Sequence, residues 1–199
     1  MVICFTYGDS ITKKSVKIYN FENGEFFKYI NNKSSIYFLL SWYNKKNEEY
    51  YIIQISYGRI LINNLNNDDV YAELKQEPED INYDGFIFNK NDIDYLCCSL
   101  NNGYIHIWNL YDKKIFKIIY INKSRFMGMV PWNEKYFCVS DLENKSLKVI
   151  DVKQNKVISN FKVNNNKVST LKKCLHPIYG ESLLILTKDG IIKLLNVKN

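Results

Sequence analysis

The sequence predicts an all-β protein built from a repeated unit of four antiparallel strands. Tyr, Ile and Phe are abundant, Ala occurs once, and Gly and Pro are few. Residues that are β-branched or aromatic suit a pleated, half-buried surface. Short apolar segments recur along all 199 residues with polar turns between them, and no sustained helical periodicity interrupts them. Composition and pattern together favour strands from one end of the chain to the other.

One phrase, best preserved as NGYIHIWNL at 102–110, recurs along the chain. Each copy has two apolar residues two positions apart, and then an amide or carboxylate before another apolar residue. This polar column consists of Asn20, Asn64, Asn109, Asp151 and Asn196. Its intervals are 64 − 20 = 44, 109 − 64 = 45, 151 − 109 = 42 and 196 − 151 = 45 residues. A nearly fixed period of this length is typical of repeat architectures.

A second column supports the first, because an apolar strand that ends in a hydroxyl lies just before each phrase. The hydroxyl column consists of Thr6, Ser56, Ser99, Ser140 and Thr187. Turn residues join the two strands, most clearly Asn102-Gly103 and Asp189-Gly190, which suit a two-residue hairpin turn whose central positions both need positive φ.

Two further strands fill each interval, one after the polar column and one before the hydroxyl strand. Four strands per repeat predict a β-propeller of four-stranded antiparallel blades, with about four to five blades present and incomplete terminal blades. The first unit lacks its innermost strand and the last lacks its outermost strand. The phase is unbroken, so we expect a single propeller region over 1–199. Its units span approximately 1–30, 35–75, 81–121, 125–163 and 168–199.

The segment Ile105 to Asn109, together with Ser99 on the preceding strand, resembles the WD-repeat family of propellers. The other copies depart from the family pattern: Trp108 is the one Trp in its column, Asp151 is the one acid, and no Gly-His dipeptide occurs. We therefore do not expect the family's buried Asp-His-Ser-Trp hydrogen-bond network. Another propeller family with four-stranded blades remains an alternative.

The resemblance implies a ring that often has seven blades, so the chain reads as the C-terminal part of a larger propeller. The rival interpretation is a partial ring that closes on itself or on another chain. In either case the unpaired edges of the terminal blades predict that the isolated chain self-associates or is poorly soluble.

The cysteine content indicates an intracellular protein, cytoplasmic or nuclear, and the charge indicates a solvated basic surface. The net charge of +6 aids solubility and favours acidic partners, but falls short of a nucleic-acid-binding tail. No zinc-ligand spacing links the five cysteines, so we expect reduced, mostly buried thiols, with no metal and no cofactor. We see no signal peptide, and no apolar segment has the roughly 18 residues of a membrane span. The cysteines are Cys4, Cys97, Cys98, Cys138 and Cys174.

No residue pattern predicts catalysis. The two histidines, His106 and His176, have no nucleophile–base–orienter arrangement around them in the sequence. We therefore expect no catalytic residues and no enzyme activity. A hydrolase on a propeller scaffold is an alternative that no cluster of residues supports.

Binding is expected on the loops that enter each innermost strand, because these loops project on one face together with the hairpin turns. Three of the loops are basic and the fourth, 77–80, is acidic. The candidate partner-binding residues are Lys33, Lys123, Arg125 and Lys167. The simpler interpretation is a set of solvated Asn/Lys loops. Trp42 and Trp132 are expected in the core or channel lining rather than in a binding hot spot.

The leading hypothesis is a non-catalytic protein–protein interaction scaffold that presents this loop face within a multiprotein complex. The alternative is an RNA-associated propeller subunit of a ribonucleoprotein complex. Nucleic-acid binding by stacking needs exposed aromatic residues interleaved with Lys or Arg, whereas most of the tyrosines here lie in alternating strand patterns.

Overall fold

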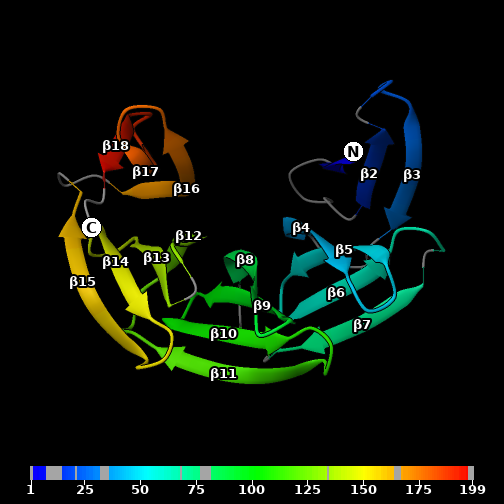
Figure 1. Cartoon of the computed structure of the whole chain (residues 1–199), viewed down its shortest axis with the longest axis horizontal. Helices are drawn as coiled ribbons and strands as arrows, with labels where there is room; N and C mark the ends of the chain where they lie inside the picture. The colour runs from blue at the N-terminus through cyan, green and yellow to red at the C-terminus, as the bar shows by residue number, and fades with distance from the viewer. Residues whose placement is uncertain are drawn as a thin grey trace. The chain divides into compact units, whose positions relative to one another are not determined.

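A computed structural model describes residues 2–7, 15–20, 22–31, 36–67, 69–76, 82–133, 135–163 and 167–196. These residues form β-strands joined by turns, and no helix occurs among them (Figure 1). Accordingly, the described ranges contain no helix long and apolar enough to cross a membrane. The all-β prediction is confirmed.

The strands form five antiparallel sheets, which we number as blades 1 to 5. Blade 1 contains β1 (Val2–Tyr7), β2 (Ser15–Asn20) and β3 (Phe26–Asn31). Blade 2 contains β4 (Ile36–Asn44), β5 (Glu49–Ser56), β6 (Arg59–Asn64) and β7 (Val70–Lys75). Blade 3 contains β8 (Asn82–Lys90), β9 (Ile93–Leu100), β10 (Tyr104–Asn109) and β11 (Lys114–Tyr120). Blade 4 contains β12 (Phe126–Pro131), β13 (Tyr136–Asp141), β14 (Ser146–Asp151) and β15 (Lys156–Lys162). Blade 5 contains β16 (Val168–His176), β17 (Gly180–Thr187) and β18 (Ile192–Asn196).

Three blades have four strands, and the two terminal blades have three within the described residues. The predicted composition of the blades is therefore confirmed. The chain divides into two compact units, 1–81 with blades 1 and 2, and 82–199 with blades 3 to 5. The expectation of a single region over 1–199 stays a prediction.

In blades 1 to 4, the polar column caps the turn between the third and the fourth strand. The side-chain oxygen of Asn20 accepts the backbone N–H of Glu22 at 2.9 Å, and that of Asn64 accepts the N–H of Asn66 at 2.7 Å. The same bond recurs at Asn109, to Tyr111, and at Asp151, to Lys153. Asn and Asp are favoured here because their short side chains satisfy the backbone two residues on. The side chain of Asn196 lies outside the described residues.

The hairpin turns differ in one respect from the prediction. At 101–103 the loop has three residues and only its glycine, Gly103, adopts positive φ, at +88°. Gly190 likewise has φ +83° in a loop of four residues. The two-residue turn with both central residues at positive φ is Asn91-Asp92, between β8 and β9. Asn and Asp tolerate this conformation, so the turn needed no glycine and gave no glycine signal.

Every fourth strand carries a bulge at the same place. The pairing register shifts between the third and fourth strand of blades 1 to 4, which leaves one large residue unpaired in each. These bulge residues are Phe27, Tyr71, Phe116 and Ile158. Phe27, Phe116 and Ile158 are about half exposed, at 59%, 55% and 49%. A bulge redirects side chains and strengthens the local twist.

Neighbouring blades in each unit pack through apolar faces. In the unit 1–81, Val16 and Ile18 of blade 1 share a cluster with Ile36 and Ile52 of blade 2. In the unit 82–199, one cluster joins blades 3 and 4 and another joins blades 4 and 5. The first strands β8, β12 and β16 contact one another in sequence. Within each unit, neighbouring sheets thus bury apolar faces against one another.

Buried polar bonds also join blade 3 to blade 4. The Ser99 hydroxyl donates to the Phe126 carbonyl at 2.8 Å, and the Met129 N–H donates to the Asp84 carboxylate at 2.8 Å. Trp108 Nε1 is buried and has no hydrogen-bond partner among the described residues. Ser99 therefore bonds to a backbone carbonyl of blade 4 and not to Trp108.

Candidate binding groove and loop face

At two of the junctions between blades, a lysine on the fourth strand of one blade forms a hydrogen bond to the next blade. In blades 1 to 4, one residue of the third strand pairs with one residue of the fourth strand at the same position. These pairs are Ile18 with Lys28, Ile62 with Ala72, Ile107 with Lys117, and Val149 with Ser159. Lys28 Nζ donates to the Leu65 carbonyl at 2.6 Å, and Lys117 Nζ donates to the Val152 carbonyl. Each acceptor directly follows the polar column of the next blade. These lysine links join blade 1 to blade 2 and blade 3 to blade 4.

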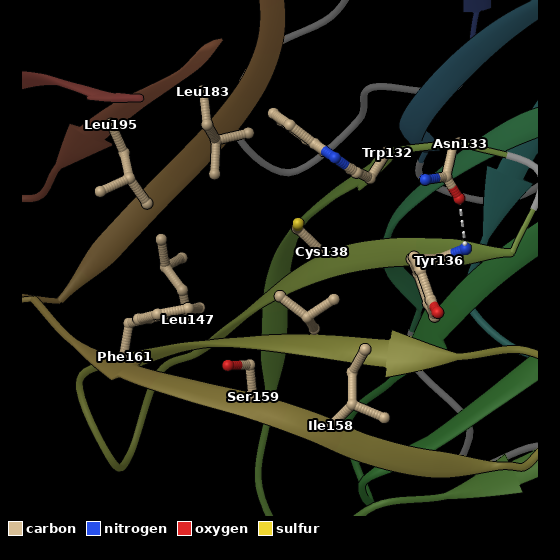
Figure 2. Close-up of a pocket in the computed structure, with 11 residues that line it drawn as sticks. Trp132, Asn133, Tyr136, Cys138, Leu147, Ile158, Ser159, Phe161, Leu183 and Leu195 are labelled. Carbon is tan, nitrogen blue, oxygen red and sulfur yellow. Dashed lines mark hydrogen bonds between the residues drawn. The ribbon is translucent and has the colours of Figure 1, made fainter. Parts of the chain in front are cut away.

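Ser159 occupies the same position on β15 but is too short to make such a link. Beside it lies a cavity of about 280 Å³ between blades 4 and 5, which we call the groove (Figure 2). The residues that line it are Trp132, Asn133, Tyr136, Cys138, Leu147, Val149, Ile158, Ser159, Phe161, Leu183 and Leu195. Its volume approaches the range of small-ligand pockets, and its lining is mostly apolar.

Aliphatic side chains from both blades form the wall of the groove. Leu183 and Leu195 of blade 5 point toward Leu147 of blade 4 (Figure 2). Leu183 and Leu147 are buried in the core cluster between these blades, and Leu195 packs against it. Ile158, the bulge residue of β15, is 49% exposed. The groove is thus continuous with the rigid core on one side and open on the other.

The end of the groove near β12 carries its polar atoms. The Asn133 side chain accepts the Tyr136 N–H at 3.0 Å, which fixes the turn between β12 and β13 (Figure 2). Lys173 donates to the Trp132 carbonyl at 2.7 Å, and its ammonium lies 5.2 Å from the centre of the Trp132 ring. Trp132 therefore belongs to the core, as predicted, and also lines the groove.

Cys138 lines the groove but is a poor nucleophile there. It is a free thiol that is 4% exposed, and burial raises its pKa to about 11. The thiolate is the reactive form, so Cys138 contributes apolar surface at neutral pH. Cys97 and Cys98 are free and buried and Cys174 is free and half-buried, while the side chain of Cys4 lies outside the described residues.

The four predicted loop residues have different surroundings. Lys33 lies outside the described residues. Lys123 and Arg125, in the loop before β12, and Lys167, just before β16, are exposed. The Lys188 N–H donates to the Lys167 carbonyl at 2.8 Å, so this loop lies beside the turn between β17 and β18. Lys167 is therefore a neighbour of this turn, and the shared loop face stays a prediction.

Arg125 is already bound to an acid. Its Nε lies 2.6 Å from Glu143, and its backbone N–H donates to the same carboxylate at 2.7 Å. Burial alone would raise the pKa of Asp141 and of Glu143, but hydrogen bonds lower both below their ordinary values. The Ser124 hydroxyl lies between the two carboxylates, the Asn144 N–H donates to Asp141, and the Arg125 N–H donates to Glu143. This network ties the loop before β12 to the turn after β13, and it reduces the positive charge that the loop offers to a ligand.

Both histidines have structural surroundings. His176 Nδ1 accepts the N–H groups of Ile178 and Tyr179 and so caps the turn after β16. The His106 ring lies 6.4 Å from the Trp108 ring in an edge-to-face contact. Among the described residues, no group of three His, Cys, Asp or Glu side chains is arranged to hold a metal ion.

The sequence interpretation missed the groove. Its signal is the column Lys28, Ala72, Lys117 and Ser159, whose intervals of 44, 45 and 42 residues repeat those of the polar column. Ser159, at the last position of this column, lines the groove between blades 4 and 5. The role of this column becomes visible only when the acceptor carbonyl of the next blade is known.

Comparisons with known proteins support the fold alone. No family model matches the sequence, and no curated protein matches it. Among solved structures, the chain is similar to the WD40 β-propeller domain of Doa1, with a TM-score of 0.74 at 10% sequence identity. The similarity covers 94% of this chain and 59% of that one, so the chain spans well under two thirds of the structure it matches. The chain therefore has the β-propeller fold of WD40 domains.

Proposed function

We propose that the chain is a non-catalytic interaction scaffold that binds protein partners within a multiprotein complex. WD40-type propellers commonly mediate protein interactions, which supports this class of function. The observation that carries the proposal is the groove between blades 4 and 5, because it is apolar, open and held by buried strands on both sides. Pockets of this kind accept the anchoring side chains of a partner.

An RNA-associated role is the alternative, and the surface favours it less. Arg125 is bound to Glu143, so this loop residue offers less positive charge to a phosphate backbone than the sequence suggests. The free, buried thiols also fit a reducing compartment, and we place the complex in the cytoplasm or nucleus.

Salt dependence of binding distinguishes the two roles. We expect the complex formed by the 199-residue chain to weaken only a few-fold between about 50 and 200 mM salt and to survive ribonuclease. A contact to several phosphates would instead weaken by about a thousandfold or more over that range. The measurement is the dissociation constant of the purified complex at each salt concentration. Log-linear collapse with salt, together with loss on ribonuclease treatment, would contradict the protein-scaffold proposal.

Filling the groove gives a matched pair of variants. Ser159→Phe places a ring in the groove, whereas Asn160→Phe places it on the neighbouring exposed residue of β15 that does not line the groove. We expect the first variant to weaken partner binding at least about tenfold and the second to leave it unchanged. Equal affinities of the two variants would show that partners bind elsewhere on the chain.

A further inference from the structure

The first hairpin of blade 5, between β16 and β17, ends in three exposed apolar side chains. Leu175, Ile178 and Tyr179 are 79%, 79% and 54% exposed, and we call them the apolar tip. Among the described residues, no large hydrophobic side chain is more exposed than Leu175 and Ile178. Clustered exposed apolar side chains mark sites of interaction with a protein or a membrane.

Hydrogen bonds and ring stacking hold the apolar tip in place. His176 Nδ1 accepts the Ile178 N–H at 3.2 Å and the Tyr179 N–H at 3.3 Å. The His176 ring also stacks on the Tyr179 ring, with the ring centres 4.7 Å apart. The pairing of β16 with β17 continues up to His176 and Gly180. An ordered anchor of this kind loses little conformational freedom on binding.

The hairpin of blade 5 is longer than that of the neighbouring blade 4. β17 begins seven positions before its hydroxyl residue Thr187 (187 − 180 = 7), whereas β13 begins four positions before Ser140 (140 − 136 = 4). The difference of about three residues corresponds to roughly 10 Å of strand. The apolar tip therefore projects beyond the adjacent turn of blade 4.

The corresponding hairpin of blade 3 is nearly as long, but its end is polar. β9 begins six positions before Ser99 (99 − 93 = 6), and the exposed residues beside this turn are Asn89, Lys90, Asn91 and Asp92. Turns in water normally carry such residues. The fold thus does not require apolar side chains at this position, and those of blade 5 need another explanation.

The apolar tip lies at one end of the blades, together with the turns after β8, β10, β12 and β14. Connections after the first and the third strand of an antiparallel sheet lie at the same end. These ends adjoin in neighbouring blades of the unit 82–199. Lys173 of blade 5 donates to the Trp132 carbonyl of blade 4, and a small cavity is lined by Phe88 of blade 3 and by Asn133 and Val152 of blade 4.

This end of the unit is basic. Lys173 and Glu181, beside the tip, form an ion pair at 2.6 Å and offset each other. The exposed carboxylates described in the other turns are Asp92 and Asp112. Six exposed lysines lie in or next to the same turns: Lys90, Lys113, Lys114, Lys135, Lys153 and Lys156. Positive charge therefore exceeds negative charge around the apolar tip.

Shape and charge together select the surface that fits this end. A projecting aliphatic tip needs an apolar medium, and the lysines around it need anions. An anionic bilayer offers both, because its hydrocarbon lies beneath negatively charged head groups. A second copy of this chain would bring the same lysines, and like charges across an interface are unfavourable. An RNA backbone would offer the anions without an apolar medium.

We propose that the apolar tip docks the protein on the surface of an anionic membrane. Leu175 and Ile178 enter the boundary between head groups and acyl chains, and the six lysines face anionic head groups. Tyr179 lies at the level of the head groups, which suits an apolar ring with a polar end. Binding is peripheral and reversible. This inference goes beyond the proposed scaffold function and does not depend on it.

Vesicle flotation with the 199-residue chain tests the proposal. The vesicles contain phosphatidylcholine alone or with about 30% phosphatidylserine, and self-associated protein stays at the bottom of the gradient. We expect at least about tenfold stronger binding to the anionic vesicles, because the lysines contribute only there. Ile178→Ser should weaken this binding at least about tenfold, since an apolar side chain no longer leaves water.

Ile191→Ser is the matched control for the tip. Ile191 is 45% exposed and lies in the turn after β17, at the other end of the same blade. We expect this variant to bind the anionic vesicles as the natural protein does.

A pair of charge reversals tests the lysines in the same way. Lys153→Glu combined with Lys156→Glu should weaken binding to anionic vesicles at least about tenfold. Lys167→Glu combined with Lys188→Glu changes the charge equally at the other end of blade 5, and we expect a much smaller loss from it.

Insertion of the tip can be observed directly. The natural tryptophans Trp42, Trp108 and Trp132 are buried, so a new tryptophan at the surface reports its own surroundings. With anionic vesicles, Ile178→Trp should shift its fluorescence to shorter wavelength and be quenched by brominated lipids. Ile191→Trp should show neither change.

Three results would overturn the inference: no flotation with anionic vesicles, equal flotation of Ile178→Ser and the natural protein, or unchanged fluorescence of Ile178→Trp. If Ile178→Ser instead abolished binding of a protein partner while vesicles stayed unbound, the tip would be an anchor for a protein and the membrane proposal would fail. Partner binding that persists in Ile178→Ser leaves the scaffold proposal intact, whatever the vesicles show. The two proposals are therefore separable.

Discussion

Replacing Gly103 with alanine is expected to destabilise the unit 82–199 by at least about 3 kcal/mol. A Cβ on Gly103 would lie 1.7 Å from the Asn122 carbonyl oxygen and 2.7 Å from its carbonyl carbon. The obstacle is backbone, so it cannot be relieved by a side-chain rotation. Gly103 also has φ +88°, a conformation that costs a residue with a Cβ about 1–2 kcal/mol. Urea unfolding of the natural protein and the variant measures the difference.

Gly190→Ala is the matched control for this substitution. Gly190 has a similar φ of +83°, but a Cβ there would meet nothing within 4 Å. Its substitution therefore carries the cost of the backbone conformation alone, about 1–2 kcal/mol. Equal losses of stability in the two variants would show that the turn after β9 does not lie as close to the loop before β12 as the structure places it.

The carboxyl of Asp84 is expected to make stability fall as pH rises from about 4 to 7. Asp84 is 9% exposed on β8, and its two oxygens accept the N–H groups of Gly85 and Met129, each at 2.8 Å. Burial nevertheless raises its pKa from 3.8 to about 6, since it outweighs the two donors that favour the charged form. The folded protein therefore binds this proton more tightly than the unfolded chain does.

The sign of the effect follows from that difference. The contribution of Asp84 to the free energy of unfolding is fully present below pH 3.8 and is lost as pH rises through about 6. A difference of about two pKa units corresponds to about 3 kcal/mol. Asp141 and Glu143 act in the opposite direction, because their pKa values are lowered. The total pH dependence of stability is thus a sum of opposing contributions.

Asp84→Asn isolates the contribution of this one group, because an amide does not titrate. We expect the stability of the natural protein relative to this variant to decrease by about 2.5 kcal/mol between pH 4 and 7.5. Denaturant unfolding at four or five pH values measures it. A stability difference that is constant with pH would show that the Asp84 carboxyl titrates near its ordinary value in the folded protein.

Much of the fold could be predicted from the sequence because its signals are local. The polar column marks the end of every third strand, and Asn64 or Asp151 caps its turn with a bond to a residue two positions on. The apolar alternation places the strands, and the positions of the incomplete terminal blades follow from the phase of the repeat. The two-residue turn at Asn91-Asp92 was not predicted because its two residues with positive φ are not glycines.

The candidate site was far less predictable, because it depends on contacts between blades. Lys117 is one of many exposed-looking lysines until the Val152 carbonyl of the next blade is placed beside it. The Ser159 side chain is too short to reach the next blade, and no sequence motif indicates that such a hydrogen bond is absent. In the same way, the positive charge expected of Arg125 is offset by Glu143, which lies 18 positions later in another turn.

Site-specific photo-crosslinking is the most direct test of partner contact at the groove. A benzophenone side chain at Ile158 would lie at the groove, whereas the same group at Phe116 would occupy the equivalent bulge of blade 3. The two sites are similarly exposed, at 49% and 55%. We predict a ribonuclease-resistant crosslink to a partner protein from position 158 and none from position 116. Equal crosslinking from both positions, or a crosslink only to RNA, would contradict the binding of partner proteins at the groove.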